Sequence, residues 1–483
     1  MYLGIDIGTS AVKLLLVDMT GAPVASASSE LDILRPQSGF SEQDPEWWWQ
    51  AVNKAAGELR GTYPNYMAAI RSIGLSGQMH GMVALNKDDQ VLRPAILWND
   101  TRCAAEADEL DKNEPAFRDI GGNSVMPGFT APKALWMARN EPELFAQIST
   151  ILLPKDYVRF CMSGEKVSEM SDAAGTLWLD VAGRCWSEPL LAATGLSMHH
   201  MPRLVEGSAV SCKLRADIAD DWGIEGQPVI AGGGGDNAAA AIGLGIAAPG
   251  DGFVSLGTSG VVFTVTENFA PAAASGAHAF CHAVPHTWHQ MGVILAASDC
   301  VSWLCEITGL DVETLMADMA KTDLADTSIL FHPYLSGERT PHNNAEARGG
   351  FFGLSRADGP GDMARAVLQG VSFAIADAMD VLRSAGGAPQ RLLATGGGAN
   401  NHQWLSYVAS VTGCPIAVPS GADQGAALGA ARLAMLADGH AVDDICTQPD
   451  IAETIQPDAK LAAQLAPARS RSQQLYHFIE ASQ

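Results

Sequence analysis

The two halves of the chain contain the same short pattern, and this internal repeat limits the folds that the chain can adopt. Near the N-terminus, an apolar run ends in Gly-Thr-Ser-Ala-Val at residues 8–12, and a second apolar run ends in Gly-Thr-Ser-Gly-Val at residues 257–261. Apolar runs on both sides of such a turn predict a pair of antiparallel strands. Because the pattern occurs once in each half, we expect two similar α/β domains, residues 1–245 and residues 246–483.

Each half also contains a predicted strand that ends in a run of glycines and leads into a helix. In the first half the glycines are residues 232–235, and Asp236 and Asn237 stand at the start of an alanine-rich helix. The glycines allow a tight turn and the close approach of a ligand. A carboxylate at this place can accept a proton or hold a metal ion, and the helix dipole favours its ionised form. Asp236 can equally be an ordinary helix N-cap.

The two halves differ at the positions where chemistry is most expected. Asp6 of the first half aligns with Ser255 of the second, and Asp236 aligns with Ala399, beside the second glycine run at residues 396–398. Both acids therefore belong to the first half. We infer a division of labour across a cleft, in which the first half supplies carboxylates and the second binds a large, flat, phosphorylated ligand. The Gly-Thr-Ser turns either bind anions through their N–H groups or are ordinary turns.

Apolar periodicity and turn residues predict the other elements. We expect an antiparallel meander of three strands at residues 2–8, 12–17 and 23–31. Further strands are expected at residues 70–76, 91–98 and 415–418, and a loop with a short strand at residues 172–180. Helices are expected from Pro45, with Asp44 as N-cap, and at residues 363–384 and 424–436.

Two of these strands end in polar residues. The strand at residues 70–76 leads into Gly-Gln-Met-His-Gly, and the strand at residues 91–98 leads into Asn-Asp-Thr-Arg. In open α/β sheets, ligands bind at the edge where such strands end. His80 is therefore either a ligand-binding residue or a core histidine, and Asp100 either contacts a ligand or pairs with Arg102.

Composition and absent motifs argue against several classes of function. The formal net charge of −24 disfavours binding to nucleic acid or to an anionic membrane. The nine cysteines include no Cys-x-x-Cys pair, so we expect neither a disulfide framework nor a zinc site, and a cytoplasmic location. We expect no secretory signal and no membrane span. No P-loop, His-Glu-x-x-His or Gly-x-Ser-x-Gly motif occurs, and turns between antiparallel strands do not fit a dinucleotide-binding fold of an NAD-dependent oxidoreductase.

These motifs together resemble the FGGY carbohydrate kinases, which belong to the superfamily of actin, hexokinase and the heat-shock chaperone ATPases. The resemblance spans essentially the whole chain and is carried by residues 4–10, 232–237, 256–260 and 396–398. The family's two signature regions are similar to residues 126–136 and 350–354. The resemblance implies two ribonuclease-H-like domains around a cleft and the transfer of phosphate from ATP to a sugar.

The resemblance also implies a role for each matching residue. Asp236 would be the general base that takes the proton from the sugar hydroxyl, and Asp6 together with Asp236 would hold Mg²⁺ near the phosphates. ATP would be contacted from both halves, by Thr9, Lys13, Gly257, Thr258, Gly397, Gly398 and Asn401. The sugar would be bound by Met79, His80, Trp98, Asp100 and Asn237. Trp98 packs either in the core or against the apolar face of the sugar.

Within the family, the most similar members are bacterial kinases that phosphorylate D-xylulose at O5, and this similarity lies at residues 78–81, 98–100, 171–176 and 337–344. Members that act on glycerol carry Arg-Glu at the positions of Met79 and His80, which argues against glycerol. Ribulose, fuculose and gluconate stay open as substrates, and a non-enzymatic, actin-like nucleotide switch stays open as a function. Arg339 and His342 lie in a polar loop that reaches either the nucleotide or a subunit interface, such as that of a homodimer.

Overall fold

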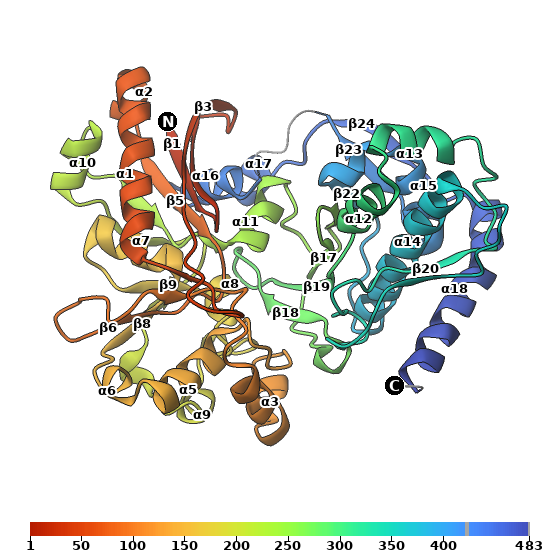
Figure 1. Cartoon of the computed structure of the whole chain (residues 1–483). Coiled ribbons are helices and arrows are strands. Elements are labelled where there is room, and N and C mark those ends of the chain that lie inside the picture. The colour runs from red at the N-terminus through yellow and green to blue at the C-terminus, as the bar shows by residue number, and fades with distance from the viewer. Residues whose placement is uncertain (421–424, 482–483) are drawn as a thin grey trace.

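The computed structural model describes residues 1–420 and 425–481 and contains two seven-stranded sheets, one in each half of the chain (Figure 1). The first sheet has the order β13-β14-β5-β1-β2-β3, with β15 beside β5. As predicted, its first three strands form an antiparallel meander, and β5 then pairs parallel with β1. Its strands are β1 (Tyr2–Ile7), β2 (Ala11–Val17), β3 (Pro23–Glu30), β5 (Ser72–Gly77), β13 (Val210–Lys213), β14 (Val229–Ala231) and β15 (Gly234–Gly235).

The second sheet repeats this topology in the order β18-β19-β17-β16-β22-β23-β24. Its β16 pairs antiparallel with β17 and parallel with β22, as β1 does with β2 and β5. The predicted duplication of two α/β domains is therefore confirmed. The strands are β16 (Gly252–Leu256), β17 (Gly260–Thr266), β18 (His278–Cys281), β19 (Trp288–Ile294), β22 (Leu392–Thr395), β23 (Ile416–Pro419) and β24 (Ile451–Ile455).

Ten short strands form five two-stranded sheets outside these two. They are β4 (Glu42–Gln43) with β7 (Ala95–Ile96), β6 (Val83–Leu85) with β8 (Thr150–Leu152), β9 (Val167–Glu169) with β12 (Arg203–Val205), β10 (Leu179–Asp180) with β11 (Cys185–Trp186), and β20 (Leu330–His332) with β21 (Gly350–Phe352).

Helices cover both sheets. Those of the first half are α1 (Pro45–Thr62), α2 (Pro64–Ala68), α3 (Ala104–Asn113), α4 (Ala116–Asp119), α5 (Thr130–Asn140), α6 (Pro142–Phe145), α7 (Pro154–Ser163), α8 (Met170–Ala174), α9 (Glu188–Ala192), α10 (Ala216–Trp222) and α11 (Asp236–Gly243). Those of the second half are α12 (Ser298–Thr308), α13 (Val312–Met319), α14 (Pro360–Ser384), α15 (His402–Thr412), α16 (Gly425–Ala437), α17 (Val442–Ile445) and α18 (Ala459–Glu480).

Two local predictions were wrong. The strand expected at residues 91–98 is reduced to β7, because Pro94 cannot donate a ladder hydrogen bond at its start. The loop expected over residues 172–180 is wrong for residues 172–174, which lie in α8, because the Glu169 carboxylate accepts hydrogen bonds from two backbone N–H groups of the first turn, at 2.8 and 2.9 Å. The short strand expected in the same stretch is present as β10. Asp44 caps α1 as predicted. Gln424, the predicted first residue of the last helix, lies outside the described residues.

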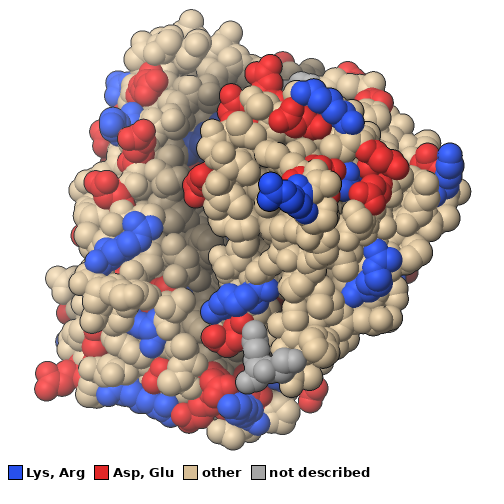
Figure 2. Space-filling model, turned by 45° about the vertical axis from the view of Figure 1, so that its right-hand side comes forward, with Lys and Arg blue, Asp and Glu red and all other residues tan. Residues whose placement is uncertain are grey.

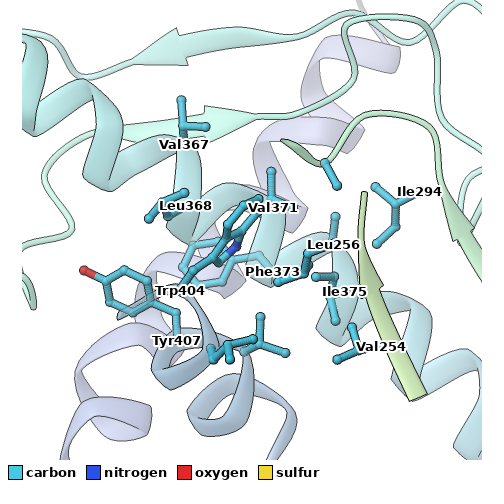
Figure 3. Close-up of a cluster of buried hydrophobic side chains, with 14 of the residues drawn as sticks. Val254, Leu256, Ile294, Val367, Leu368, Val371, Phe373, Ile375, Trp404 and Tyr407 are labelled. Atoms are coloured by element: carbon cyan, nitrogen blue, oxygen red, sulfur yellow. The ribbon is translucent and has the colours of Figure 1, made fainter. Parts of the chain in front are cut away.

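The core of the second domain is a layer of apolar side chains between its sheet and two helices (Figure 3). Val367 and Val371 lie one helical turn apart on α14 and are buried, as is Tyr407 on α15. They pack with Val254 and Leu256, which point from β16 into the same cluster. The strand that ends at the second Gly-Thr-Ser turn is therefore held on a rigid layer.

Helix α16 comes from the second half of the sequence but packs against β1, β5 and α11 of the first domain (Figure 1). The contact is so close that only glycine fits. A Cβ added at Gly429 would lie 1.7 Å from the carbonyl oxygen of Ala239, and one added at Gly74 would lie 1.8 Å from that of Ala430. The division of the chain at residue 245 stays a proposal based on the sequence repeat.

Substitution of Gly429 by alanine tests this contact. We expect Gly429→Ala to lower the free energy of unfolding by about 3 kcal/mol, because the new methyl group can fit only if α11 and α16 move apart. Gly57→Ala is the matched control, since Gly57 lies in α1 with nothing within 4 Å of an added Cβ. The free energy of unfolding of Gly57→Ala should rise by up to about 1 kcal/mol, because alanine favours the helix more than glycine does. If urea denaturation gave the same change in the free energy of unfolding for Gly429→Ala and Gly57→Ala, the close contact between α11 and α16 would be contradicted.

Candidate active site

The carboxylate of Asp236 lies at the first position of α11, directly after the glycine run. Gly235 is the N-cap residue, so Asp236 is not the cap. Oδ1 of Asp236 accepts hydrogen bonds from the backbone N–H and the side-chain Nδ2 of Asn237, at 2.7 and 2.9 Å. Burial raises the pKa of Asp236 to about 7, and the negative charge of Asp6 contributes to this increase. Such a carboxylate is suited to proton exchange near neutral pH.

Asp6 is the second acid that the sequence placed in the site. It lies on β1 opposite Lys13 of β2 and beside Ser76 of β5. Burial raises its pKa, and the charge of Lys13 offsets part of the increase. Its Oδ1 is buried and has no hydrogen-bond partner among residues 1–420 and 425–481. The structure thus brings Asp6 and Asp236 close enough for the charge of one to affect the other.

Thr9 connects the first Gly-Thr-Ser turn to the ends of two other segments. Its Oγ1 donates a hydrogen bond to Oε1 of Gln78, at 3.2 Å, and accepts one from the indole N–H of Trp98, at 3.0 Å. Gln43 donates to its backbone oxygen, at 2.8 Å. Trp98 is 49% exposed, so its ring is not part of the core. The structure therefore argues against packing of Trp98 in the core and leaves its ring available to a ligand.

His80 lies beside the glycine run, and its surroundings determine its protonation state. Its Nδ1 lies 2.7 Å from the carbonyl oxygen of Gly175, and because a carbonyl can only accept, Nδ1 carries the hydrogen. Burial lowers the pKa of His80 to about 3, so the ring is neutral and Nε2 is an acceptor. Met79 is buried beside it. A Cβ at Gly235 would lie 2.9 Å from Sδ of Met79, so the glycine run packs directly on this segment.

Lys133 supports His80, and the sequence did not indicate this role. His80 has a φ of 69°, which is unusual for a residue other than glycine. The Nζ of Lys133 donates hydrogen bonds to the carbonyl oxygens of His80 and Gly128, at 2.8 and 2.7 Å. Burial lowers the pKa of Lys133 to about 7. Lys133 thus fixes the backbone that presents the imidazole.

Asp100 is engaged in a buried ion pair. Its Oδ2 lies 2.6 Å from Nη2 of Arg102 and accepts a hydrogen bond from the backbone N–H of Ser41, at 2.6 Å. Arg102 also pairs with Glu42, at 2.6 Å, and its guanidinium lies over the ring of Phe40. Both side chains of the pair are essentially inaccessible to solvent. The structure therefore shows the pairing with Arg102, and a contact between Asp100 and a sugar stays a prediction.

A pocket of about 450 Å³ lies between the C-terminal end of α11 and the second domain, and a hollow between the two halves is visible in Figure 2. Gly243 and Leu244 line it from the first half, and Thr395 to Gly397 line it from the second. Its volume is within the usual range for small-molecule sites. The resemblance places Gly397, Gly398 and Asn401 along the adenosine of ATP, and of these three Gly397 lines this pocket.

The other predicted nucleotide residues lie around this pocket or support it. Gly398 is buried against Leu256 and Trp404, and Asn401 caps α15 by accepting a hydrogen bond from the backbone of Trp404, at 3.0 Å. The turn at Gly257 and Thr258 abuts the second glycine run, since a Cβ at Gly396 would lie 2.7 Å from N of Gly257. The carbonyl oxygens of Gly257 and Thr258 hold the start of α12.

A buried charge cluster lies beneath the first glycine run, and no sequence pattern identified it. Lys155 contacts Asp156, Glu169 and Asp172 at 2.8, 3.3 and 3.1 Å, with all four side chains fully buried. Arg159 joins the cluster through Asp156 and donates to the carbonyl oxygen of Gly232. Oγ of Ser171 accepts a hydrogen bond from N of Gly235, at 3.0 Å. The cluster therefore holds the loop that leads to Asp236.

Two features are absent from residues 1–420 and 425–481. These residues contain no group of three or more His, Cys, Asp or Glu side chains arranged to hold a metal ion. The helices of the same residues include none with the length and apolarity that a membrane crossing needs.

Comparisons with known proteins were made for the whole chain. The sequence model of the N-terminal domain of the FGGY family of carbohydrate kinases matches residues 1–243, and that of the C-terminal domain matches residues 252–437. The chain is 47% identical to xylulose kinase of Escherichia coli K12 over 479 residues, covering 99% of this chain and 98% of the relative. It is also 47% identical to xylulose kinase of Klebsiella pneumoniae over 476 residues, covering 97% of each chain.

Solved structures agree with these matches. The crystal structure of a xyloylose kinase from Brucella ovis superposes with a TM-score of 0.98 at 50% identity and covers 100% of both chains. The crystal structure of xylulose kinase from Rhodospirillum rubrum superposes with a TM-score of 0.93 at 27% identity and covers 99% of both chains.

The raised pKa of Asp236 predicts how stability depends on pH. A carboxylate whose pKa rises on folding destabilises the fold above that pKa and has no such cost below the unfolded value of 3.8. We therefore expect Asp236→Asn to stabilise the protein by up to about 4 kcal/mol at pH 8, with the difference shrinking towards pH 4.

The matched control is Asp18→Asn. The pKa of the partly exposed Asp18 is lowered by hydrogen bonds from Thr20, so its replacement should not stabilise the protein at pH 8. Thermal unfolding followed from pH 4 to pH 8 checks both variants. An Asp236→Asn protein that is no more stable than wild type at pH 8 would contradict the raised pKa.

Proposed function

Because this chain belongs to the FGGY family of carbohydrate kinases, we propose that it phosphorylates D-xylulose with ATP to give D-xylulose 5-phosphate. The observation that carries the proposal is the 47% identity to two xylulose kinases over nearly the full length of each chain. The site chemistry supports it, since a carboxylate near neutrality, a neutral histidine and an exposed tryptophan lie around the first Gly-Thr-Ser turn.

We assign the role of general base to Asp236. The O5 hydroxyl of the sugar is a weak nucleophile until its proton is removed, and a positioned carboxylate can take that proton as the bond to phosphorus forms. The hydrogen bonds from Asn237 hold one carboxylate oxygen and orient the other. Because the transition state of phosphoryl transfer is loose, positioning contributes more than the strength of the base.

The neighbouring side chains suit the binding of a polyhydroxylated molecule. Nε2 of His80 can accept a hydrogen bond from a sugar hydroxyl, because its other nitrogen donates to Gly175. Trp98 offers an exposed apolar face, and Met79 packs beneath the site. Asn237 adjoins the base, and Asp100 would act through the loop that it braces with Arg102.

ATP would lie across the two domains. We place its adenosine in the pocket beside Gly397, with Gly398 and Asn401 behind the pocket wall, and its phosphates between the turns at Thr9 and Thr258, near Lys13 and Gly257. Asp6 and Asp236 fit a magnesium site, because Asp6 has a buried oxygen with no hydrogen-bond partner among the described residues and its negative charge disfavours the ionisation of Asp236 unless a cation is present. Magnesium typically uses one or two carboxylates plus phosphates. When bound, it neutralises phosphate charge.

Two properties of the whole protein also belong to the proposal. We propose a cytoplasmic location, which the nine free cysteines support. We also propose that two chains can form a homodimer. An actin-like nucleotide switch would have no use for the side chains that surround Asp236, and ribulose, fuculose and gluconate are alternative outcomes of the first test below.

The first test is turnover against a panel of sugars. Purified protein with Mg²⁺ and ATP should phosphorylate D-xylulose faster than D-ribulose, L-ribulose, fuculose, gluconate and glycerol in an ADP-coupled assay. Asp236→Ala should lower kcat by about 10²- to 10⁴-fold while ATP still binds. Turnover of another sugar would change the substrate, and sugar-independent ATP hydrolysis that survives the substitution would favour a nucleotide switch.

The second test is the pH dependence of turnover. A general base works only when ionised, so kcat/KM for Mg²⁺-ATP at saturating D-xylulose should fall about tenfold per unit as pH drops below 7. The value of kcat should fall at a lower pH, because the bound cation favours the ionised carboxylate. Initial rates between pH 5 and pH 9 measure both. A flat profile across this range would exclude Asp236 as the base.

A further inference from the structure

Arg339 lies at the seam between the two domains, in the loop between β20 and β21. Its backbone is fixed by neighbours on both sides. The backbone N–H of Thr340 donates to the carbonyl oxygen of Val293 on β19, at 3.0 Å, and Oε1 of Glu338 accepts from N of Leu295, at 3.0 Å. A Cβ at Gly276 would lie 2.7 Å from the carbonyl oxygen of Arg339, so the loop packs closely at this point. The side chain therefore starts from a well-defined position.

The guanidinium of Arg339 has few partners. One nitrogen, Nη1, lies 3.3 Å from Nε2 of His278. Nδ1 of His278 lies 2.9 Å from Oδ1 of Asn123, which also accepts from the backbone of Ala279, so Nδ1 is the donor and Nε2 accepts from Arg339. No ion pair involves Arg339 among residues 1–420 and 425–481. Burial lowers its pKa, and the charge of neighbouring Glu338 offsets part of the decrease.

A cluster of four rings connects His278, the partner of Arg339, to His80 of the candidate sugar site. The ring of Phe129 lies 4.7 Å from that of His80 and 5.6 Å from that of His278. The ring of Phe280 lies 6.3 and 5.5 Å from the same two histidines. The charge of Arg339 is among the influences on His80. The ring cluster thus joins His80 of the first domain to the arginine of the second.

The chemistry of a ketopentose defines what such a cation can recognise. D-Xylulose closes its five-membered ring through O5, so O5 is free for phosphorylation only in the open-chain form. That form carries a free carbonyl at C2, whose oxygen can only accept hydrogen bonds. His80 offers an acceptor, which serves a hydroxyl, whereas a guanidinium offers several fixed donors. A site that binds the open-chain form therefore needs both a hydrogen-bond acceptor for a hydroxyl and a donor for the carbonyl oxygen.

We propose that Arg339 binds the C2 carbonyl oxygen of the open-chain ketose, so that the second domain takes part directly in choosing the sugar. The inference rests on the proposed function and assigns a binding residue beyond it. It also gives a reason for keeping at the seam a cation for which the described residues provide no ion-pair partner.

The test compares Arg339→Met with wild type. We expect KM for D-xylulose to rise about tenfold to a hundredfold, because a charge-assisted hydrogen bond is lost, while KM for ATP stays unchanged. Arg339→Lys keeps the charge but lacks the planar, forked guanidinium, so its KM for D-xylulose should lie between those of wild type and Arg339→Met. The inhibition constant of xylitol, which lacks the carbonyl, should not change. An equal loss for xylitol and D-xylulose, or a rise in KM for ATP, would overturn the proposal.

Stability separates a binding role from a structural one. Arg339→Met should unfold at the same temperature as wild type or higher, since it removes a desolvated cation to which the described residues offer one neutral hydrogen bond and no ion pair. Arg469→Met is the matched control, because Arg469 pairs with Asp377, at 2.6 Å, on α14. That variant should lose stability and keep its KM for D-xylulose. If Arg339→Met loses stability while its KM is unchanged, the role of Arg339 is structural and the inference fails.

The same assays distinguish failure of the inference from failure of the proposed function. If wild type does not phosphorylate D-xylulose, the proposed function is wrong. If wild type turns over D-xylulose and Arg339→Met does so with the same KM, only the role of Arg339 is wrong.

Discussion

The arrangement of the whole site depends on the contact between α11 and α16. The two helices meet backbone to backbone at Gly429, where a single added carbon would lie 1.7 Å from the carbonyl oxygen of Ala239. Helix α11 begins with Asp236, and α16 comes from the half of the sequence that carries the second glycine run. The position of the acid is therefore fixed by a segment of the other half. A change in the relative position of the two halves would be transmitted to Asp236 through this contact, which is too tight to absorb it.

Electrostatics sets the reactivity of the acid once packing has placed it. Asp236 and Asp6 are both desolvated, and the charge of Asp6 further disfavours the ionisation of Asp236. Beneath them, Lys155 and Arg159 compensate buried acids and hold the carbonyl oxygen of Gly232. The positive charges of the cluster thus stabilise the loop rather than the ionised form of Asp236. The two acids therefore lack nearby positive charge from this cluster. A cation that binds together with the anionic nucleotide would supply that charge.

Much of the fold could be predicted from the sequence, because its signals are local. The Gly-Thr-Ser turns between apolar runs predicted the antiparallel strand pair that starts each sheet, and Asp44 with Pro45 predicted the start of α1. The return of α16 to the first sheet could not be predicted, since glycine and alanine show that a helix can pack closely but not against which partner. For the same reason, the support of His80 by Lys133 and the link from Arg339 to His278 were missed. Such contacts join residues that are distant in the chain, and only the tertiary structure reveals them.

The central claim is that Asp236 takes the proton from O5 of D-xylulose. The most direct measurement is a crystal structure of the protein with D-xylulose, Mg²⁺ and a non-hydrolysable ATP analogue. The account predicts that O5 lies about 2.6–3.2 Å from the free carboxylate oxygen of Asp236 and in line with the γ-phosphorus. A sugar whose O5 points away from Asp236, with a water or another hydroxyl at the carboxylate, would contradict it.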